Sequence, residues 1–275
     1  MMTILDGPLG TELVARGVSI PEPLWSARAL EQAPDVVAAI HRDYAAAGAT
    51  VHTTNTFRTK RRTAGDAWEK LARKAVEIAR LSVPPSHRVA GSIAPLEDCY
   101  RPDLSPPDPR AEHRELCRVL ADAGVDLLLC ETFAHVGEAL VATEEAVATG
   151  LPTWVAFTAG PDADLLSPAE LERGAREAAT RGASVVFVNC TRATKTLPYV
   201  QRLAQVGVPF GVYANAGPLE DGLGWTDAPG GPERHAELAA EWVRLGATFV
   251  GACCGLGPAH IRALARTFQS TVRLA

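Results

Sequence analysis

Cysteine is scarce in this chain, with six residues among 275. Small secreted domains held together by disulfides are far richer in cysteine, so a disulfide scaffold is excluded and the thiols are expected to bind metal, react or pack. The chain also lacks a basic start followed by an apolar stretch, and it has no apolar run of about 18 residues. We therefore expect a cytoplasmic protein without a signal peptide or membrane span.

The chain also lacks an excess of basic residues: it has 27 Lys and Arg and 32 Asp and Glu, which gives a net charge of −5. Neither nucleic acid nor an anionic membrane surface would be attracted to such an average field. The composition is otherwise ordinary, with 47% hydrophobic and 21% charged residues, so a sizeable core can form. Small-molecule substrates are the expected partners, and a homo-oligomer is compatible with the sequence.

Short apolar runs alternate with longer segments rich in Ala, Leu, Glu and Arg, which is typical of strands alternating with helices. The expected strands are residues 3–5, 50–54, 88–93, 125–130, 153–158, 184–189, 209–213 and 248–252. The expected helices are residues 34–47, 66–81, 111–123, 136–148, 168–181, 197–206, 232–245 and 258–267. Eight such units can close, so residues 1–275 are predicted to form one domain, a single (β/α)8 TIM-type barrel of the α/β class. An open doubly wound sheet is the alternative.

Several expected strands follow a glycine that fits the left-handed cap at the end of a helix. These glycines are Gly48, Gly124, Gly182, Gly207 and Gly246. Two segments rich in Pro, Gly and acidic residues, 96–110 and 215–231, are expected to be loops after the third and seventh strands. In a barrel, loops that follow strands form the face on which substrate sites are built.

Three of the cysteines fall at the expected carboxyl ends of strands. Cys190 ends the sixth strand, and Cys253 and Cys254 follow the eighth within a glycine-flanked segment. Their sulfurs could converge on a zinc ion and leave its fourth position open, as in catalytic zinc sites. Buried cysteines are, however, often packing residues, so spacing alone leaves both interpretations open. We expect the remaining cysteines to be structural: Cys99, Cys117 and Cys130.

The sequence resembles the homocysteine S-methyltransferase family, whose members include betaine– and S-methylmethionine–homocysteine methyltransferases. The matching segments are DGPLGTEL (6–13), TTNTF (53–57), GSIAP (91–95), ETF (131–133), VNC (188–190), YANAG (213–217) and GACCG (251–255). They span nearly the whole chain in the family's order. The resemblance implies that Cys190, Cys253 and Cys254 bind Zn²⁺ and that homocysteine supplies a fourth sulfur. No catalytic side chain beyond the zinc-activated substrate thiol is then required.

The resemblance also implies how the amino-acid part of homocysteine is bound. Asp6 and Glu131 would face its ammonium group, and backbone N–H groups around Gly7 and Thr54 would hold its carboxylate. Asn215 would orient a zinc ligand or the substrate. From the residues alone, Asp6 could instead cap a turn, Glu131 could form a salt bridge at the rim, and Asn215 could belong to a turn.

Three departures from the family pattern lie in loops that would shape the methyl-donor pocket. Pro8 stands where Gly or Ala is commoner, Ala214 where Pro is common, and residues 94–100 replace a Gly-Pro-Tyr-Gly segment. A stand-alone barrel resembles the members that use S-methylmethionine, which is therefore the expected donor among sulfonium and ammonium compounds. Aromatic side chains suited to a methylated cation are Trp25, Phe57, Tyr100, Tyr213 and Trp225.

Two alternatives remain at this point. A zinc hydrolase or lyase would need a base near the metal, and His52 is the histidine closest to an expected strand end. A homologue that binds zinc or an amino acid without turnover is the other. The predicted product of the methyltransferase reaction is methionine, which would place the enzyme in methionine biosynthesis.

Overall fold

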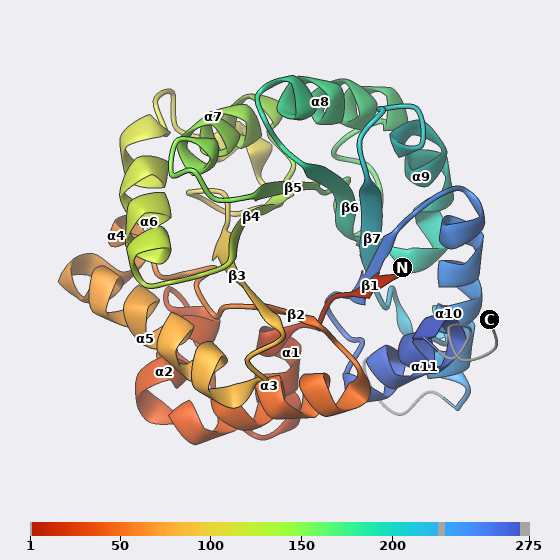
Figure 1. Ribbon diagram of the computed structural model, residues 1–275, viewed down its shortest axis with the longest axis horizontal. Coiled ribbons are helices and arrows are strands. Elements are labelled where there is room, and N and C mark those ends of the chain that lie inside the picture. The colour runs from red at the N-terminus through yellow and green to blue at the C-terminus, as the bar shows by residue number, and fades with distance from the viewer. Residues whose placement is uncertain (1, 225–228, 270–275) are drawn as a thin grey trace.

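The computed structural model describes residues 2–224 and 229–269, and its centre is an eight-stranded parallel sheet (Figure 1). The strands are β1 (Thr3–Ile4), β2 (Val51–Thr53), β3 (Arg88–Ile93), β4 (Leu127–Phe133), β5 (Thr153–Phe157), β6 (Val185–Arg192), β7 (Phe210–Asn215) and β8 (Phe249–Ala252). Strands adjacent in sequence are also adjacent in space, and β1 pairs with β8.

The sheet closes between β1 and β2. Leu5 bridges to Val51 in parallel, and the Asp6 N–H donates to the Val51 carbonyl oxygen at 3.0 Å. On the other side of the bridge, the Thr50 N–H donates to the Ile4 carbonyl oxygen at 2.9 Å. Closure removes the open edges of a doubly wound sheet, so the predicted (β/α)8 barrel is confirmed.

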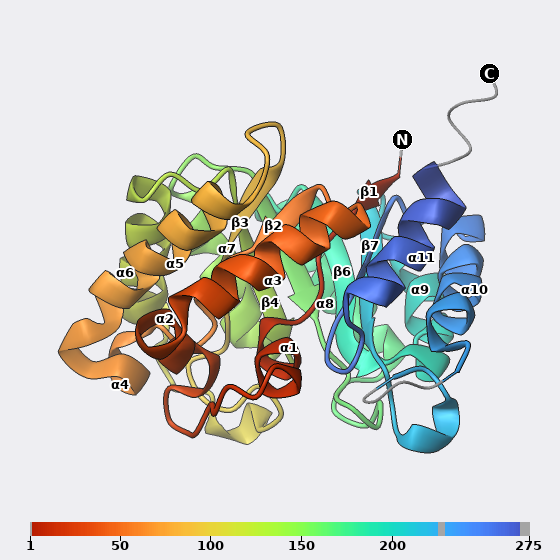
Figure 2. The ribbon, with the colours of Figure 1, turned by 90° about the horizontal axis from the view of Figure 1, so that it is seen from below.

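Helices form a ring around the strands (Figures 1 and 2). The α-helices are α1 (Leu9–Ala15), α2 (Ala29–Gln32), α3 (Pro34–Ala47), α4 (Arg61–Ala64), α5 (Trp68–Ser82), α6 (Arg110–Asp122), α7 (Val136–Val147), α8 (Pro168–Thr180), α9 (Leu197–Leu203), α10 (Gly231–Arg244) and α11 (Pro258–Gln269). The 3₁₀ helices are η1 (Trp25–Arg28), η2 (Gly65–Ala67), η3 (Pro102–Leu104), η4 (Ala193–Lys195) and η5 (Leu219–Asp221). Among the described residues, no helix is long and apolar enough to cross a membrane.

The predicted glycine caps are confirmed, because all five glycines at the helix ends have positive φ angles, between 87° and 111°. The eight expected helices correspond to α3 and α5 to α11. The sequence did not predict the short helices between β1 and α3, or η3 within the loop after β3.

Strands β4, β6 and β7 run further than expected, and the first two contain an irregularity. The register of β4 shifts between Cys130 and Phe133, and that of β6 shifts between Asn189 and Arg192. A bulge redirects the side chains that follow it. Here the shifts enclose Thr132 and Cys190, non-glycine residues with φ angles of 64° and 46°.

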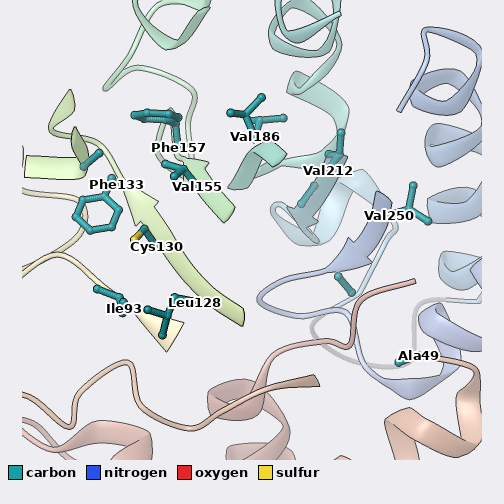
Figure 3. Packing of buried hydrophobic residues seen from close by; sticks show 14 of the residues in the cluster. Ala49, Ile93, Leu128, Cys130, Phe133, Val155, Phe157, Val186, Val212 and Val250 are labelled. Atoms are coloured by element: carbon teal, nitrogen blue, oxygen red, sulfur yellow. The ribbon is translucent and has the colours of Figure 1, made fainter. Parts of the chain in front are cut away.

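The core has two parts, as alternation along each strand requires. One part lies between strands and helices and includes Leu128, Val155 and Val186 (Figure 3). The other fills the barrel with apolar side chains that include Trp154 and Phe187. The ring planes of these two residues are tilted by 43° at a centroid distance of 5.7 Å. The barrel is therefore a packed core below its mouth, and the open space lies above it.

Candidate active site

A cavity of about 250 Å³ lies at the barrel mouth, lined by residues at and after the carboxyl ends of strands. This is the face on which barrel enzymes place their sites. The predicted site residues that line it are Asp6, Gly7, Thr54, Glu131, Cys190, Cys253 and Cys254. Asn215 is not among the lining residues.

The three predicted cysteines converge in this cavity. Their Sγ atoms all lie within 4.8 Å of one another. Cys190 and Cys253 are in direct contact as a disulfide pair, and Cys254 is a free thiol beside them. Thiols close enough to share a metal ion are also close enough to oxidise, so the same convergence accounts for both arrangements. The three sulfurs form a group that could hold a metal ion.

Cys190, on β6, is held by side chains from β4 and β7. The Thr132 hydroxyl donates to the Cys190 Sγ at 3.8 Å, and Asn189 Nδ2 donates to the Thr132 hydroxyl at 2.8 Å. From β7, Asn215 Nδ2 donates to the Cys190 carbonyl oxygen at 2.8 Å. These contacts fix the backbone that presents the sulfur. No role was predicted for Thr132 or Asn189, because the register shifts that aim their side chains carry no sequence signal of their own.

Cys254 belongs to a loop that is bonded on both sides. Its carbonyl oxygen accepts the Ala216 N–H at 2.9 Å, and the following Gly255 N–H donates to the Thr11 hydroxyl at 3.3 Å. Burial raises the pKa of the Cys254 thiol to about 11. The free thiol is therefore protonated at neutral pH, and a nearby cation is needed to favour the thiolate.

Two buried carboxylates share the cavity with the cysteines. Asp6 accepts hydrogen bonds from the Thr53 N–H at 2.8 Å and the Thr53 hydroxyl at 3.1 Å. Glu131 accepts hydrogen bonds from the hydroxyls of Ser92 and Tyr213. Burial raises the pKa of both carboxyl groups despite these hydrogen bonds, and their mutual repulsion raises the pKa of Asp6 further.

Neither carboxylate forms an ion pair with any side chain in the described part of the protein. Two histidines, His41 and His52, approach Asp6 closely enough for the three side chains to be a second group of potential metal ligands. Burial lowers the pKa of His41 to about 4 and that of His52 to about 3, so both rings are neutral near pH 7. They supply no positive charge, and they do not line the cavity.

Gly7 and Thr54 line the cavity but differ in what they offer a ligand. A Cβ atom at Gly7 would lie 2.6 Å from the Tyr44 hydroxyl oxygen, so this close approach requires glycine. The Thr54 N–H already donates to the Ala90 carbonyl oxygen at 2.9 Å. A carboxylate bound in this part of the cavity would therefore need amides beside Thr54 rather than its own.

The predicted aromatic residues lie at two depths of the cavity, its floor and its loops. Tyr213 lies in the floor with its hydroxyl on Glu131. Trp25, Phe57 and Tyr100 line the cavity from loops after β1, β2 and β3. Trp225 lies outside the described residues.

The family described as "Homocysteine S-methyltransferase" matches this sequence over residues 3–268. An Escherichia coli homocysteine S-methyltransferase is 34% identical, over 95% of this chain and 93% of its own. Homocysteine S-methyltransferase 4 of Zea mays is 30% identical, over 97% of this chain and 89% of its own. The chain belongs to the homocysteine S-methyltransferase family. The predicted family and enzyme class are thus confirmed.

Solved structures agree with membership in the homocysteine S-methyltransferase family. The metallated form of the E. coli homocysteine methyltransferase MmuM superimposes with a TM-score of 0.81 at 30% identity, covering 96% of each chain. Oxidised and apo forms of the same enzyme superimpose with TM-scores of 0.79 and 0.75. A dihydropteroate synthase from Stenotrophomonas maltophilia, at 14% identity and a TM-score of 0.58, shares the fold alone.

Proposed function

We propose that this protein transfers a methyl group from S-methylmethionine to the sulfur of homocysteine, with Zn²⁺ held by Cys190, Cys253 and Cys254. The observation that carries the proposal is the meeting of three cysteine sulfurs with two unpaired, buried carboxylates in one cavity. The sulfurs suit a metal that binds a thiol, and the carboxylates suit an ammonium group. Homocysteine carries both groups on one small molecule.

The donor set fits zinc, because thiolates are ligands that zinc prefers and three protein ligands leave a fourth position for substrate. The Thr132 hydroxyl, which points to the Cys190 Sγ, would stabilise negative charge on that sulfur. Bound there, zinc would lower the pKa of the substrate thiol and keep it a nucleophilic thiolate at neutral pH.

Asp6 and Glu131 would hold the homocysteine ammonium group. A cation between them would offset both the burial that disfavours their ionised forms and their mutual repulsion. Thr53, Ser92 and Tyr213 keep the two carboxylates in place through hydrogen bonds that a ligand need not break. Backbone N–H groups around Gly7 and Thr54 would receive the carboxylate, while Asn215 would act indirectly through the Cys190 carbonyl oxygen.

The methyl transfer itself is one displacement. A bond forms between the homocysteine sulfur and the methyl carbon as the bond from that carbon to the donor sulfonium breaks, and the electron pair stays on the donor sulfur. Two molecules of methionine result. The barrel as a whole would serve as one homocysteine-binding unit that fixes the two substrates in line, and positioning of this kind supplies up to about 7–11 kcal/mol in well-oriented reactions.

The test is to purify the protein under reducing conditions and to measure its zinc content and its formation of methionine from homocysteine and S-methylmethionine. A Cys190→Ser variant should lose both zinc and activity. The matched control is Cys117→Ala, which removes a buried cysteine in α6, away from the cavity. Full activity in Cys190→Ser would refute the zinc assignment.

The alternatives give different results in the same experiment. Zinc and homocysteine binding without methionine formation would identify a binding protein. A hydrolase would consume a substrate without a thiol acceptor, and it would need a base at the metal. His52 does not line the cavity, and its Nε2 lies 3.0 Å from Nδ1 of His87.

A further inference from the structure

The cavity has a basic side chain among its acidic ones. Four carboxylate side chains line the cavity: Asp6, Glu22, Asp98 and Glu131. Among the described lining residues, Arg58 is the single lysine or arginine. An arginine beside the path of a cationic methyl donor would repel it, unless the donor also carries a negative group.

The Arg58 guanidinium has unused hydrogen-bonding capacity. Its Nε is buried and has no hydrogen-bond partner within the described residues. Its one ion pair, from NH2 to Glu22 Oε1, is 3.5 Å long, and the Glu22 side chain is 65% exposed. An ion pair so long and exposed contributes little to stability. A planar guanidinium with an unpartnered N–H group and only a weak ion pair is suited to bind a carboxylate, which it can hold through two parallel hydrogen bonds.

Arg58 stands on an anchored segment, although it follows the end of β2. Before it, the Thr56 hydroxyl donates to the Ser92 carbonyl oxygen at 2.7 Å. After it, the Thr59 hydroxyl donates to the Thr56 carbonyl oxygen at 3.1 Å, and Lys60 Nζ donates to the Pro95 carbonyl oxygen. The backbone at Arg58 is thereby fixed before any ligand binds, which lowers the entropic cost of binding.

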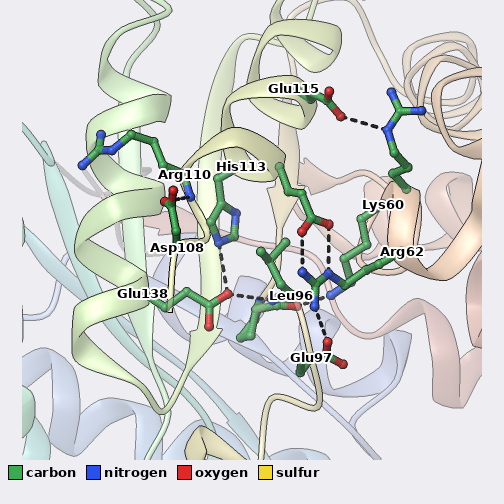
Figure 4. A network of polar contacts seen from close by, with 12 residues as sticks. Lys60, Arg62, Leu96, Glu97, Asp108, Arg110, His113, Glu115 and Glu138 are labelled. Atoms are coloured by element: carbon green, nitrogen blue, oxygen red, sulfur yellow. Dashed lines mark hydrogen bonds and ion pairs between the residues drawn. The ribbon is translucent and has the colours of Figure 1, made fainter. Parts of the chain in front are cut away.

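The loop after β3 is fixed as well, and Figure 4 shows its contacts. The Leu96 N–H donates to Glu138 Oε1 at 2.7 Å, and the same oxygen lies 3.1 Å from His113 Nε2. Arg62 pairs with Glu97 from the other side. This loop continues to Tyr100, whose ring lines the cavity.

Aromatic rings lie beside Arg58 at the same end of the cavity. The Trp25 and Phe57 rings meet edge to face at a centroid distance of 6.0 Å. Trp25 has a φ angle of 45°, and Gly10 leaves space for its indole, because a Cβ atom there would fall among the ring atoms. Aromatic faces attract a sulfonium cation, so this end offers groups for the sulfonium and for the carboxylate of a donor such as S-methylmethionine.

We propose that Arg58 binds the carboxylate of the methyl donor and thereby restricts this enzyme to donors that carry one. The inference rests on the proposed function and adds to it the residue that selects the second substrate. Trp25 receives the methylated cation, while Arg58, whose Cζ lies 6.0 Å from the centroid of the Phe57 ring, balances the negative group of the same molecule. Cationic donors without a carboxylate are then poorer substrates because they meet the guanidinium unpaired.

The test compares S-methylmethionine with (3-aminopropyl)dimethylsulfonium, which is the same sulfonium without the carboxylate. Methionine formation is measured at saturating homocysteine with zinc-loaded protein. In the wild type, loss of the carboxylate should lower kcat/KM by about 10- to 100-fold, the range for a hydrogen-bonded charge pair. In Arg58→Ala, that difference should fall to about twofold, through a raised KM for S-methylmethionine and an unchanged or improved kcat/KM for the truncated donor.

Arg58→Gln serves as a second variant in case the alanine substitution disturbs folding, and Arg58→Lys should recover part of the discrimination. The matched control is Arg61→Ala, which removes a guanidinium that pairs with Glu115 and does not line the cavity. It should keep the wild-type preference. Equal use of both donors by the wild type, or an undiminished preference in Arg58→Ala and Arg58→Gln, would overturn the inference and leave the proposed function intact. Absence of transfer from S-methylmethionine in the wild type would instead overturn the proposed function and this inference together.

Discussion

The floor and the rim of the cavity are built in different ways. The floor consists of Cys190, Cys253, Cys254 and Glu131, which lie at the ends of strands or directly after them. The rim consists of side chains from loops, and Arg58 is its one lysine or arginine among the described lining residues. Strand ends are held by the whole sheet, whereas loops can change without loss of the barrel. The proposed thiol chemistry would therefore lie on the part that cannot vary freely, and the proposed donor choice on the part that can.

The greatest expected difference between the two regions is the effect of removing a proposed metal ligand. Cys254→Ala should lower methyl transfer by about a thousandfold or more, because a lost ligand removes several kcal/mol of charge stabilisation. Bound zinc should fall well below one per chain, while circular dichroism stays unchanged. The measurement pairs metal analysis with a methionine assay under reducing conditions. Substantial activity in Cys254→Ala would place the thiol chemistry elsewhere.

The second prediction concerns the floor's contact with the substrate amine. Glu131→Gln keeps the shape and removes the charge, and one of the two hydrogen bonds, with Ser92 or Tyr213, reverses because the amide nitrogen donates. The KM for homocysteine should rise by about 10- to 100-fold, since a bond to a charged group is lost. The KM for the donor should stay within about twofold, and this serves as the internal control. An equal rise in both KM values would contradict the division between floor and rim.

The third prediction uses the pH dependence of stability. Burial raises the pKa of Asp6 well above its ordinary value of 3.8, so the unfolded chain loses this proton at lower pH than the native protein. The native state then binds more protons, and the Asp6 contribution to stability falls as pH rises above about 4. Asn cannot ionise, so at pH 7.5 Asp6→Asn should unfold at a higher urea concentration than the wild type. The difference between the two midpoints should be larger at pH 7.5 than at pH 4.

The measurement is urea unfolding of the zinc-loaded protein without substrate, repeated with saturating homocysteine. A bound ammonium would offset the cost of the Asp6 charge, so homocysteine should stabilise the wild type at pH 7.5 more than it stabilises Asp6→Asn. Parallel pH profiles for the two proteins would show that Asp6 is not held in an unfavourable ionised state.

The barrel could be predicted because each strand appears in the sequence as a short apolar run, and each helix as a longer segment with helical periodicity. The convergence of the cysteines could be expected because polar residues at strand ends meet at one face of a closed sheet, whereas their role as a ligand set was implied by the family resemblance. Cys190 and Cys254 come together from positions far apart in the chain through that topology alone.

What could not be predicted depends on local backbone geometry and on side-chain direction. Nothing in the residue types around Thr132 announces a register shift, and its positive φ is unusual for a β-branched residue. Asn215 was expected to orient a zinc ligand or the substrate, and its contact with the Cys190 carbonyl oxygen became visible only with the fold. Arg58 follows a matched segment, but its direction into the cavity depends on the bonds that fix Thr56 and Lys60.

The smallest expected effect tests how far the floor's rigidity matters. Thr132→Val replaces a hydroxyl by a methyl group of similar size, and it removes both the donor to the Cys190 Sγ and the acceptor for Asn189. Zinc affinity should fall by about 10-fold, the lower end of the range for groups that support metal ligands. Thr143→Val makes the same change in buried α7, where the hydroxyl donates only to the Ala139 carbonyl oxygen at 2.7 Å, and it should leave affinity unchanged. A competition titration against a zinc chelator measures both variants. Equal affinity in the two would mean that the barrel alone positions Cys190, and the hydroxyl at its sulfur would then have no part in metal binding.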